Sequence, residues 1–247
     1  MKRIFYDFSI THIVGRKKIN LFFLKKIAVI SLLLTALFGA IIYFCFLPKK
    51  VTFPKREYHY AICSTHTSEA AASEKSEQVR AQGGAGFVIF DQAYLVAVFV
   101  YPEKSFAQRV VQNLGGDAFV YTARREAVTL KAKNSVHAQT IGGTNGVIEY
   151  AIEQIYLTLI SLEKSETTTS VVKNTVFSCS QKIKSLNKKL GKIRKKYLGT
   201  DVENLIINCE RISTFFEVAY ANSGELKLVL CKVAQIFINF TNKTEIV

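Results

Sequence analysis

The chain reads YHYAIC over residues 58–63 and YLVAVF over residues 94–99, and these stretches open two copies of one pattern. In each copy, strand-like sequence leads through a polar break into helix-like sequence. The helix ends at a glycine pair, Gly83-Gly84 or Gly115-Gly116, and a second short apolar stretch follows. Glycine pairs suit the left-handed backbone that closes a helix. Two strand–helix–strand units in tandem predict an α+β domain, a ferredoxin-like βαββαβ plait within residues 51–134.

The second copy also follows the spacing of a known family. It runs from Tyr94 through alternating valines to a small residue, Ala107, in the following helix. This resembles the sporulation-related repeat (SPOR) domain, whose strands typically read Tyr-x-Val-x-Val-Gly-x-Phe, and the resemblance covers residues 58–121. The family's Gly-x-Phe reads Phe99-Val100-Tyr101 here. The resemblance implies a bacterial envelope protein that binds peptidoglycan, preferring glycan strands without peptide stems, at a division or sporulation septum.

Alternation along the predicted strands divides their side chains between two sheet faces. With Tyr60, Ile62, Val96 and Val98 turned toward the two helices of the plait, the opposite face is mostly apolar. It carries His59, Ala61, Cys63, Leu95, Ala97 and Phe99. Such a face is either covered, by C-terminal helices or a partner, or open as a platform for a glycan. Covering predicts that Leu95 and Phe99 are buried, whereas a platform makes His59 and Tyr101 candidate ligand-binding residues.

An uncharged stretch at residues 27–47 predicts a transmembrane helix, because about 20 apolar residues span a bilayer. Seven Lys/Arg and one acid precede it in residues 1–26, and fewer basic residues follow it. This bias predicts a cytoplasmic N-terminal tail and an extracytoplasmic bulk, in a single-pass protein of the cell membrane. The alternative is a cleaved signal peptide, but the apolar stretch is long for one and no Ala-x-Ala site follows it.

The positive charge of the exterior is concentrated in one segment. The formal net charge is +14, and residues 181–200 contain eight basic residues and no acid. Lys188, Lys189, Lys195 and Lys196 are therefore candidate binding residues for an anionic envelope polymer, peptidoglycan or anionic lipid. The alternative is the solvated outer face of a bundle. A nucleic-acid partner is not expected, because the topology places this segment outside the cell.

Residues 142–247 are expected to be a helical region. Eight apolar residues recur at alternating steps of four and three and predict one helix of about 25 residues with a narrow seam. They are Val172, Val176, Cys179, Ile183, Leu186, Leu190, Ile193 and Tyr197. Further helices are expected at about 201–221 and 224–241. Three antiparallel helices or a coiled-coil dimer would each bury the seam, and the helices are also a candidate surface for a protein partner.

The sequence contains no pattern typical of catalysis. The cysteines and the four histidines follow no metal-ligand spacing, and the glycine pairs match no phosphate-binding motif. Cys63, Cys179, Cys209 and Cys231 are expected as free thiols rather than as two disulfides. We therefore expect a non-catalytic, membrane-anchored envelope protein without cofactor, metal or catalytic residues. The alternative is a protein–protein scaffold that acts through its C-terminal helices, with a degenerate plait.

Overall fold

The structure is a computed structural model and describes residues 21–217 and 222–240. The chain divides into two compact units at Phe46 and Leu47. The first contains helix α1, Leu21–Phe46, whose stretch Lys26–Tyr43 has a mean hydropathy of 2.1. This helix is long and apolar enough to cross a membrane and includes nearly all of the predicted span. The predicted cytoplasmic tail falls mainly on residues 1–20, outside the described residues.

The second unit contains the predicted tandem repeat, in the order β2 (Arg56–His66), α2 (Glu69–Ala81), β3 (Phe87–Asp91), β4 (Ala93–Tyr101), α3 (Lys104–Leu114) and β5 (Phe119–Arg125). The four strands form one antiparallel sheet in the order β3-β4-β2-β5, so the first strands of the two copies are central, as predicted. Helix α2 packs on β2, β3 and β4, and α3 packs on β2, β4 and β5. The α+β class is confirmed.

The predicted division of β2 between the two sheet faces is wrong. The hydroxyl of Tyr60 donates a hydrogen bond to the carbonyl of Cys231 in a C-terminal helix, whereas Cys63 packs with Ala72 and Val79 of α2. In β4, Val96 packs against α2 as expected. The physical reason is an irregular register between β2 and β4, with shifts on both sides of Ile62. A bulge changes the phase of alternation, so two similar strands need not present equivalent residues to the same face.

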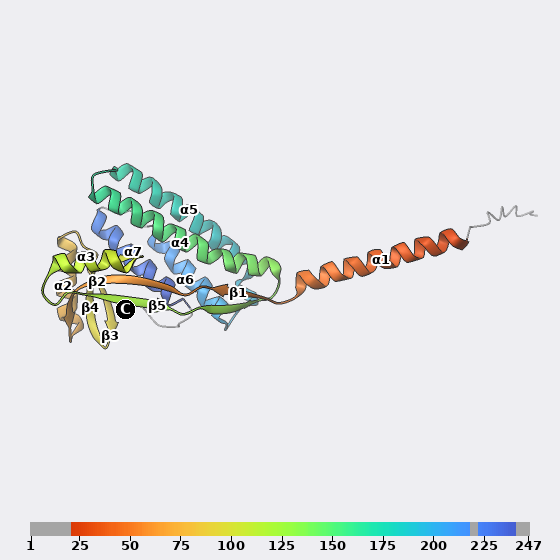
Figure 1. The fold of residues 1–247 in the computed structure, drawn as a ribbon, viewed down its shortest axis with the longest axis horizontal. Coiled ribbons are helices and arrows are strands. Elements are labelled where there is room, and N and C mark those ends of the chain that lie inside the picture. The colour runs from red at the N-terminus through yellow and green to blue at the C-terminus, as the bar shows by residue number, and fades with distance from the viewer. Residues whose placement is uncertain (1–20, 218–221, 241–247) are drawn as a thin grey trace, which may run out of the picture. The chain divides into compact units, whose positions relative to one another are not determined.

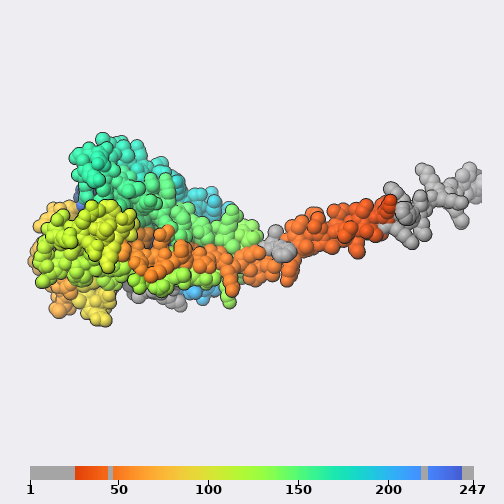
Figure 2. Space-filling model, viewed as in Figure 1, coloured from red at the N-terminus to blue at the C-terminus, as the bar shows by residue number. Residues whose placement is uncertain are grey.

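From the sequence, residues 51–57 are expected to be a short polar tether, but much of this stretch is strand. Strand β1, Lys49–Phe53, pairs with β6, Val128–Ala132, in a separate two-stranded sheet. The period-two alternation of residues 127–133 predicts an added edge strand; a strand is present there, but it pairs with β1 and not with the four-stranded sheet. Helix α4 packs on β1, and Figure 2 shows the orange β1–β2 segment and the green α4 side by side at the surface.

Four helices follow in the described residues: α4 (Ser135–Glu163), α5 (Thr169–Ile193), α6 (Asp201–Phe215) and α7 (Ser223–Ile238), with a short 3-10 turn, η1 (Arg194–Lys196). The helical region begins at Ser135, not at residue 142. The Gly142-Gly143 pair, which its sequence alone would place in a turn, lies inside α4, and a Cβ on Gly142 would touch Val51 of β1 at 3.4 Å. Helices α6 and α7 end at Phe215 and Ile238, before the ends predicted near residues 221 and 241.

The burial of the eight-residue seam is confirmed: seven members lie in α5 and Tyr197 follows η1, and all eight are buried within this one chain. Helix α5 packs against α4 and α6, and Figure 1 shows α4 and α5 lying side by side. A second copy is therefore not needed to bury the seam. The thiols also agree with expectation: Cys179, Cys209 and Cys231 are free and buried, while Cys63 is free and half-buried.

Helix α7 covers the sheet. It contacts β2, β3, β4 and β5 and also packs on α4, so it lies between the sheet and the outer helices (Figure 1). Leu95 and Phe99 are 6% and 2% exposed. The Phe99 ring stacks on Tyr156 of α4, with 6.0 Å between ring centroids. The prediction that these two side chains are buried, with C-terminal helices as the cover, is confirmed.

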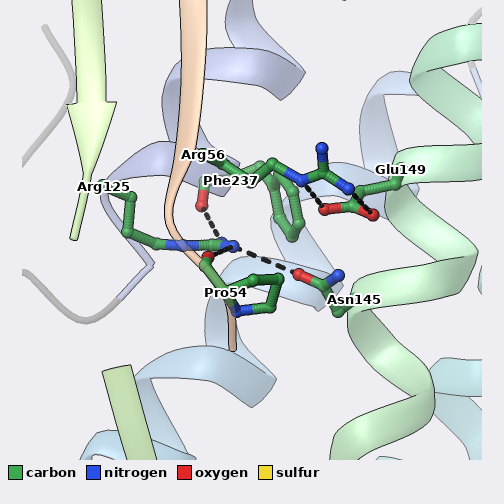
Figure 3. A network of polar contacts seen from close by, with 6 residues as sticks. All are labelled: Pro54, Arg56, Arg125, Asn145, Glu149 and Phe237. Carbon is green, nitrogen blue, oxygen red and sulfur yellow. Dashed lines mark hydrogen bonds and ion pairs between the residues drawn. The ribbon is translucent and has the colours of Figure 1, made fainter. Parts of the chain in front are cut away.

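A buried arginine joins the four-stranded sheet to the C-terminal helices (Figure 3). Arg125, at the end of β5, donates hydrogen bonds to the carbonyls of Phe237 in α7 and Pro54 before β2, at 3.0 and 3.1 Å, and to Asn145 of α4 at 3.1 Å. Beside it, Arg56 forms a two-bond ion pair with Glu149 of α4. Burial lowers the pKa of Arg125 to about 10. This network joins β5, the β1–β2 connection, α4 and α7.

Candidate functional site

The two candidate glycan residues lie opposite each other in the sheet but are buried. His59 and Tyr101 are register partners between β2 and β4 and are 7% and 6% exposed. The imidazole Nδ1 of His59 lies 2.9 Å from the Thr122 hydroxyl, and burial lowers its pKa. The Tyr101 ring packs edge-on against Phe99 and Tyr156. The structure therefore brings them together without forming an open aromatic platform.

Tyr101 does reach a cleft between α3 and α4, with a volume of about 830 Å³. Aromatic and acidic side chains share this cleft, among them Phe106, Tyr156, Glu103 and Glu153. Other carboxylates in its wall are already paired, because Glu149 binds Arg56 and Glu163 binds Lys227. Leu157, on the α4 side, is 50% exposed. The cleft suits an apolar or aromatic side chain better than a free anion.

The basic residues of α5 and η1 lie outside the buried seam, and Lys182 among them packs against Tyr150 of α4. All seven lysines between residues 182 and 196 are exposed, and Arg194 is half-buried. The helix forms this arrangement because apolar residues at steps of three and four fix one face toward α4 and α6, and the intervening positions then face outward. The four candidate lysines, Lys188, Lys189, Lys195 and Lys196, are thus on one solvent-facing surface, which we call the α5 basic face.

Three of the eight basic residues already have partners within the protein. Lys184 lies 3.4 Å from a carboxylate oxygen of Glu217, Arg194 binds Glu210 at 2.9 Å, and Lys182 lies over the Tyr150 ring at 3.7 Å. The remaining five form no ion pair with any carboxylate in residues 21–217 and 222–240: Lys188, Lys189, Lys192, Lys195 and Lys196. With respect to the described carboxylates, these five charges are available to an external anion.

A shallow groove between α4 and α5 extends the α5 basic face. Its volume is about 660 Å³, and Lys182, Lys189 and Lys192 line it together with apolar side chains that include Val147 and Leu186. Cations at the rim of an apolar groove suit an amphiphilic or polymeric anion rather than a single small ion. Ammonium groups on flexible stems act there as point charges, so the surface offers attraction without a geometrically defined catalytic centre.

The spacing of the lysines is unfavourable for the isolated helix. Lys184, Lys188 and Lys192 stand four residues apart, and like charges at this spacing destabilise a helix by about 0.2–0.5 kcal/mol per pair. Cations near the C-terminal end of a helix are favourable, which accounts in part for Lys192 but not for Lys188. Helix stability alone therefore does not explain the α5 basic face.

Sequence reasoning missed Lys192 as a site residue and the contribution of α4. The spacing that identified the seam also places Lys188, Lys192 and Lys195 at i, i+4 and i+7 on one stripe, which could have found Lys192. The Lys182–Tyr150 contact has no local signal, because it depends on how α4 packs against α5.

Comparison of the chain with family models, curated proteins and solved structures gave no match. Among the described residues, no three His, Cys, Asp or Glu side chains are grouped so that they could hold a metal ion.

Proposed function

We propose that this chain is a non-catalytic, membrane-anchored envelope protein that attaches its folded unit to an anionic envelope polymer, peptidoglycan being the foremost candidate. The observation that carries the proposal is the α5 basic face, with five exposed lysines that have no carboxylate partner in the described part of the chain. Peptide-stem carboxylates or polymer phosphates are the groups that would bind there.

The anchor and its orientation are part of this proposal. Helix α1 has the length and hydropathy of a membrane span. The excess of Lys/Arg before it supports an N-terminus in the cytoplasm, with residues 48–247 outside. In this orientation the α5 basic face meets the envelope rather than nucleic acid.

We also assign the sheet with α2 and α3 to the ferredoxin-like plait of a SPOR-like domain. The element order and the strand order β3-β4-β2-β5 support this assignment, as does the spacing from Tyr94 to Ala107. The buried state of His59 and Tyr101 argues against glycan binding on the sheet itself. In this proposal the plait is a structural platform, and localisation to a division or sporulation septum rests on the family resemblance alone.

Co-sedimentation with purified sacculi tests the attachment. The full-length protein in a neutral detergent is mixed with native or amidase-treated sacculi over a range of salt concentrations. Charge-driven binding weakens steeply as the Debye length falls from about 10 Å at 0.1 M salt toward 3 Å at 1 M. Binding that persists at high salt, and is lost on replacing His59 and Tyr101 by Ala in a protein that stays folded, would instead restore a SPOR-type glycan site.

A second candidate function is a scaffold that binds a protein partner in the α3–α4 cleft. The half-exposed Leu157 and the exposed Phe106 beside Tyr156 favour it, because apolar side chains grouped in a cleft are typical of interaction sites. Cross-linking from position 157 in cells would test it. The scaffold would be favoured over the polymer if one protein is captured, if Leu157→Lys abolishes the capture, and if replacing Lys188, Lys189, Lys195 and Lys196 by Gln leaves it unchanged.

A further inference from the structure

Strand β1 begins almost directly after the apolar helix. Helix α1 ends at Phe46 and β1 starts at Lys49, so only Leu47 and Pro48 separate them. A chain extends at most about 3.3–3.6 Å per residue, which keeps Lys49 within about 11 Å of the end of α1 in any orientation of the folded unit. If α1 spans a membrane, the start of β1 is therefore held at the membrane surface.

Pairing and packing bring other basic residues to the same end of the unit. Lys49 is the register partner of Ala132, and Lys50 is that of Lys131, so β6 ends beside the start of β1. The backbone N–H of Lys133 donates to the Tyr197 hydroxyl at 2.8 Å. Tyr197 directly follows η1, so the turn after α5 also lies here. His137, near the start of α4, contacts the same hydroxyl at 2.8 Å.

Six exposed lysines come from the segments that meet at this end: Lys50, Lys131, Lys133, Lys192, Lys195 and Lys196. We call them the basic rim. The nearby carboxylates do not neutralise it. Glu203 accepts from the backbone N–H of Gly199 at 2.6 Å and faces Arg194, and Asp201 lies in the first turn of α6, where it is favourable for the helix dipole.

Two apolar side chains project from the segments that carry this rim. Leu198 follows Tyr197 in the turn after η1 and is 64% exposed, and Val136 at the start of α4 is 68% exposed. Isolated apolar residues are common on protein surfaces, but here both are next to segments that contact Lys133 or the Tyr197 hydroxyl. Lysines around exposed aliphatic side chains are the composition of a surface that binds the interface of an anionic bilayer.

We infer that the basic rim binds anionic phospholipid head groups of the leaflet from which α1 emerges, with Leu198 and Val136 entering the interface. This would hold the folded unit against the bilayer rather than let it swing on a two-residue connection. It goes beyond polymer attachment, because Lys50, Lys131 and Lys133 belong only to the rim and Lys188 and Lys189 only to the α5 basic face, while Lys192, Lys195 and Lys196 belong to both.

The chain contains no tryptophan, so one introduced residue gives a single fluorescent reporter. Full-length Leu198→Trp protein is reconstituted in vesicles of phosphatidylcholine, alone or mixed with phosphatidylglycerol. We expect a blue-shifted emission and quenching by brominated lipid only in the anionic vesicles, both reversed by salt. The control is Phe177→Trp, at a residue that is 65% exposed in the first half of α5, whose emission should be the same in both vesicles.

The charge requirement is tested in the same reporter. Replacing Lys131, Lys133, Lys195 and Lys196 by Gln should return the emission in anionic vesicles to its value in phosphatidylcholine, since each lysine near an anionic surface contributes about fivefold in affinity. Replacing Lys188 and Lys189 by Gln should leave the blue-shifted emission in anionic vesicles unchanged.

Emission from the Leu198→Trp protein that is identical in both vesicles and unquenched would overturn the inference. That result would leave the sacculus experiment unaffected, because the latter contains no anionic lipid. The same protein is also mixed with a soluble anionic polymer. If the emission of Trp at position 198 shifts to the blue with this polymer but not with anionic vesicles, the rim binds the polymer, and the lipid assignment is overturned.

Discussion

The Tyr60 hydroxyl in β2 donates a hydrogen bond to the backbone carbonyl of Cys231 in α7, with 3.2 Å between the oxygens. Both residues are fully buried, and 171 positions separate them in the sequence. The contact holds α7 against the sheet face of Leu95 and Phe99. From the sequence, this face could have been either open to solvent or covered. The sheet is therefore part of the core of the whole folded unit, and substitutions that open this interface should destabilise the entire unit.

Phe99→Ala tests that consequence. Phe99 packs between Tyr101 and Tyr156 and is 2% exposed, so truncation leaves a cavity and should lower the free energy of unfolding by about 3–5 kcal/mol. The measurement is urea denaturation followed by circular dichroism. Phe90→Ala is the matched control, because Phe90 is 63% exposed and should cost much less. Equal effects of the two substitutions would show that α7 and α4 do not cover the sheet in solution.

Arg125→Met should destabilise the protein by about 2–4 kcal/mol, because it leaves Pro54, Asn145 and Phe237 without their donor. A single lost hydrogen bond to a charged group costs about 1.5–3 kcal/mol. Thermal denaturation compares it with Arg124→Met, a neighbouring residue whose side chain is 53% exposed and pairs with Glu57. The melting temperature of the Arg124→Met control should stay close to that of the wild type, because an exposed ion pair contributes little to stability. A variant at position 125 as stable as the control would mean that the network in Figure 3 contributes little.

Acid should destabilise the folded unit below about pH 6.5, the ordinary pKa of histidine. Burial lowers the pKa of His59 and of His137, and Lys196 and Lys133 lower that of His137 further. As the pH falls, the unfolded chain therefore binds protons at these two histidines before the folded chain does. The free energy of unfolding is not reduced by them above the pKa of the unfolded chain, and it decreases below that pKa. Melting temperatures measured between about pH 7.5 and pH 5 test this. A His59→Gln, His137→Gln double variant should have a flatter profile, and an unchanged slope would assign the effect to other groups.

The local patterns of the chain predicted much of the fold. The seam from Val172 to Tyr197 is buried as predicted. Apolar side chains at steps of three and four lie on one face of a helix, and this face packs against the rest of the protein. The tandem repeat likewise predicted the central strands correctly. The face of Tyr60 was not predictable, because the register shift beside Ile62 arises from pairing between two distant strands.

The remaining differences have the same origin in long-range contacts. Residues 51–57 read as a polar tether, but Lys49–Phe53 is a strand because residues 128–132 pair with it. The glycine pair at 142 and 143 reads as a turn, but Gly142 lies in a helix where β1 approaches closely. Residues 123–126 would be expected to form a turn, but β5 extends to Arg125, and nothing near Arg125 in the sequence indicates its partners in α4 and α7. Of the site, the sequence predicted the exposed lysines but not the burial of His59 and Tyr101.

Attachment through the α5 basic face is tested most directly by a matched pair of charge variants in the sacculus assay. One variant replaces Lys188, Lys189, Lys195 and Lys196 by Gln, and the other replaces four exposed lysines elsewhere, Lys55, Lys104, Lys164 and Lys173. Both lose the same net charge, and Gln has nearly the helix propensity of Lys. We predict that the first variant loses most binding at low salt while its circular dichroism is unchanged, and that the second keeps most of it. If the two variants lose binding equally, net charge alone accounts for the binding. If the first variant binds as strongly as the wild type, the proposed function is contradicted.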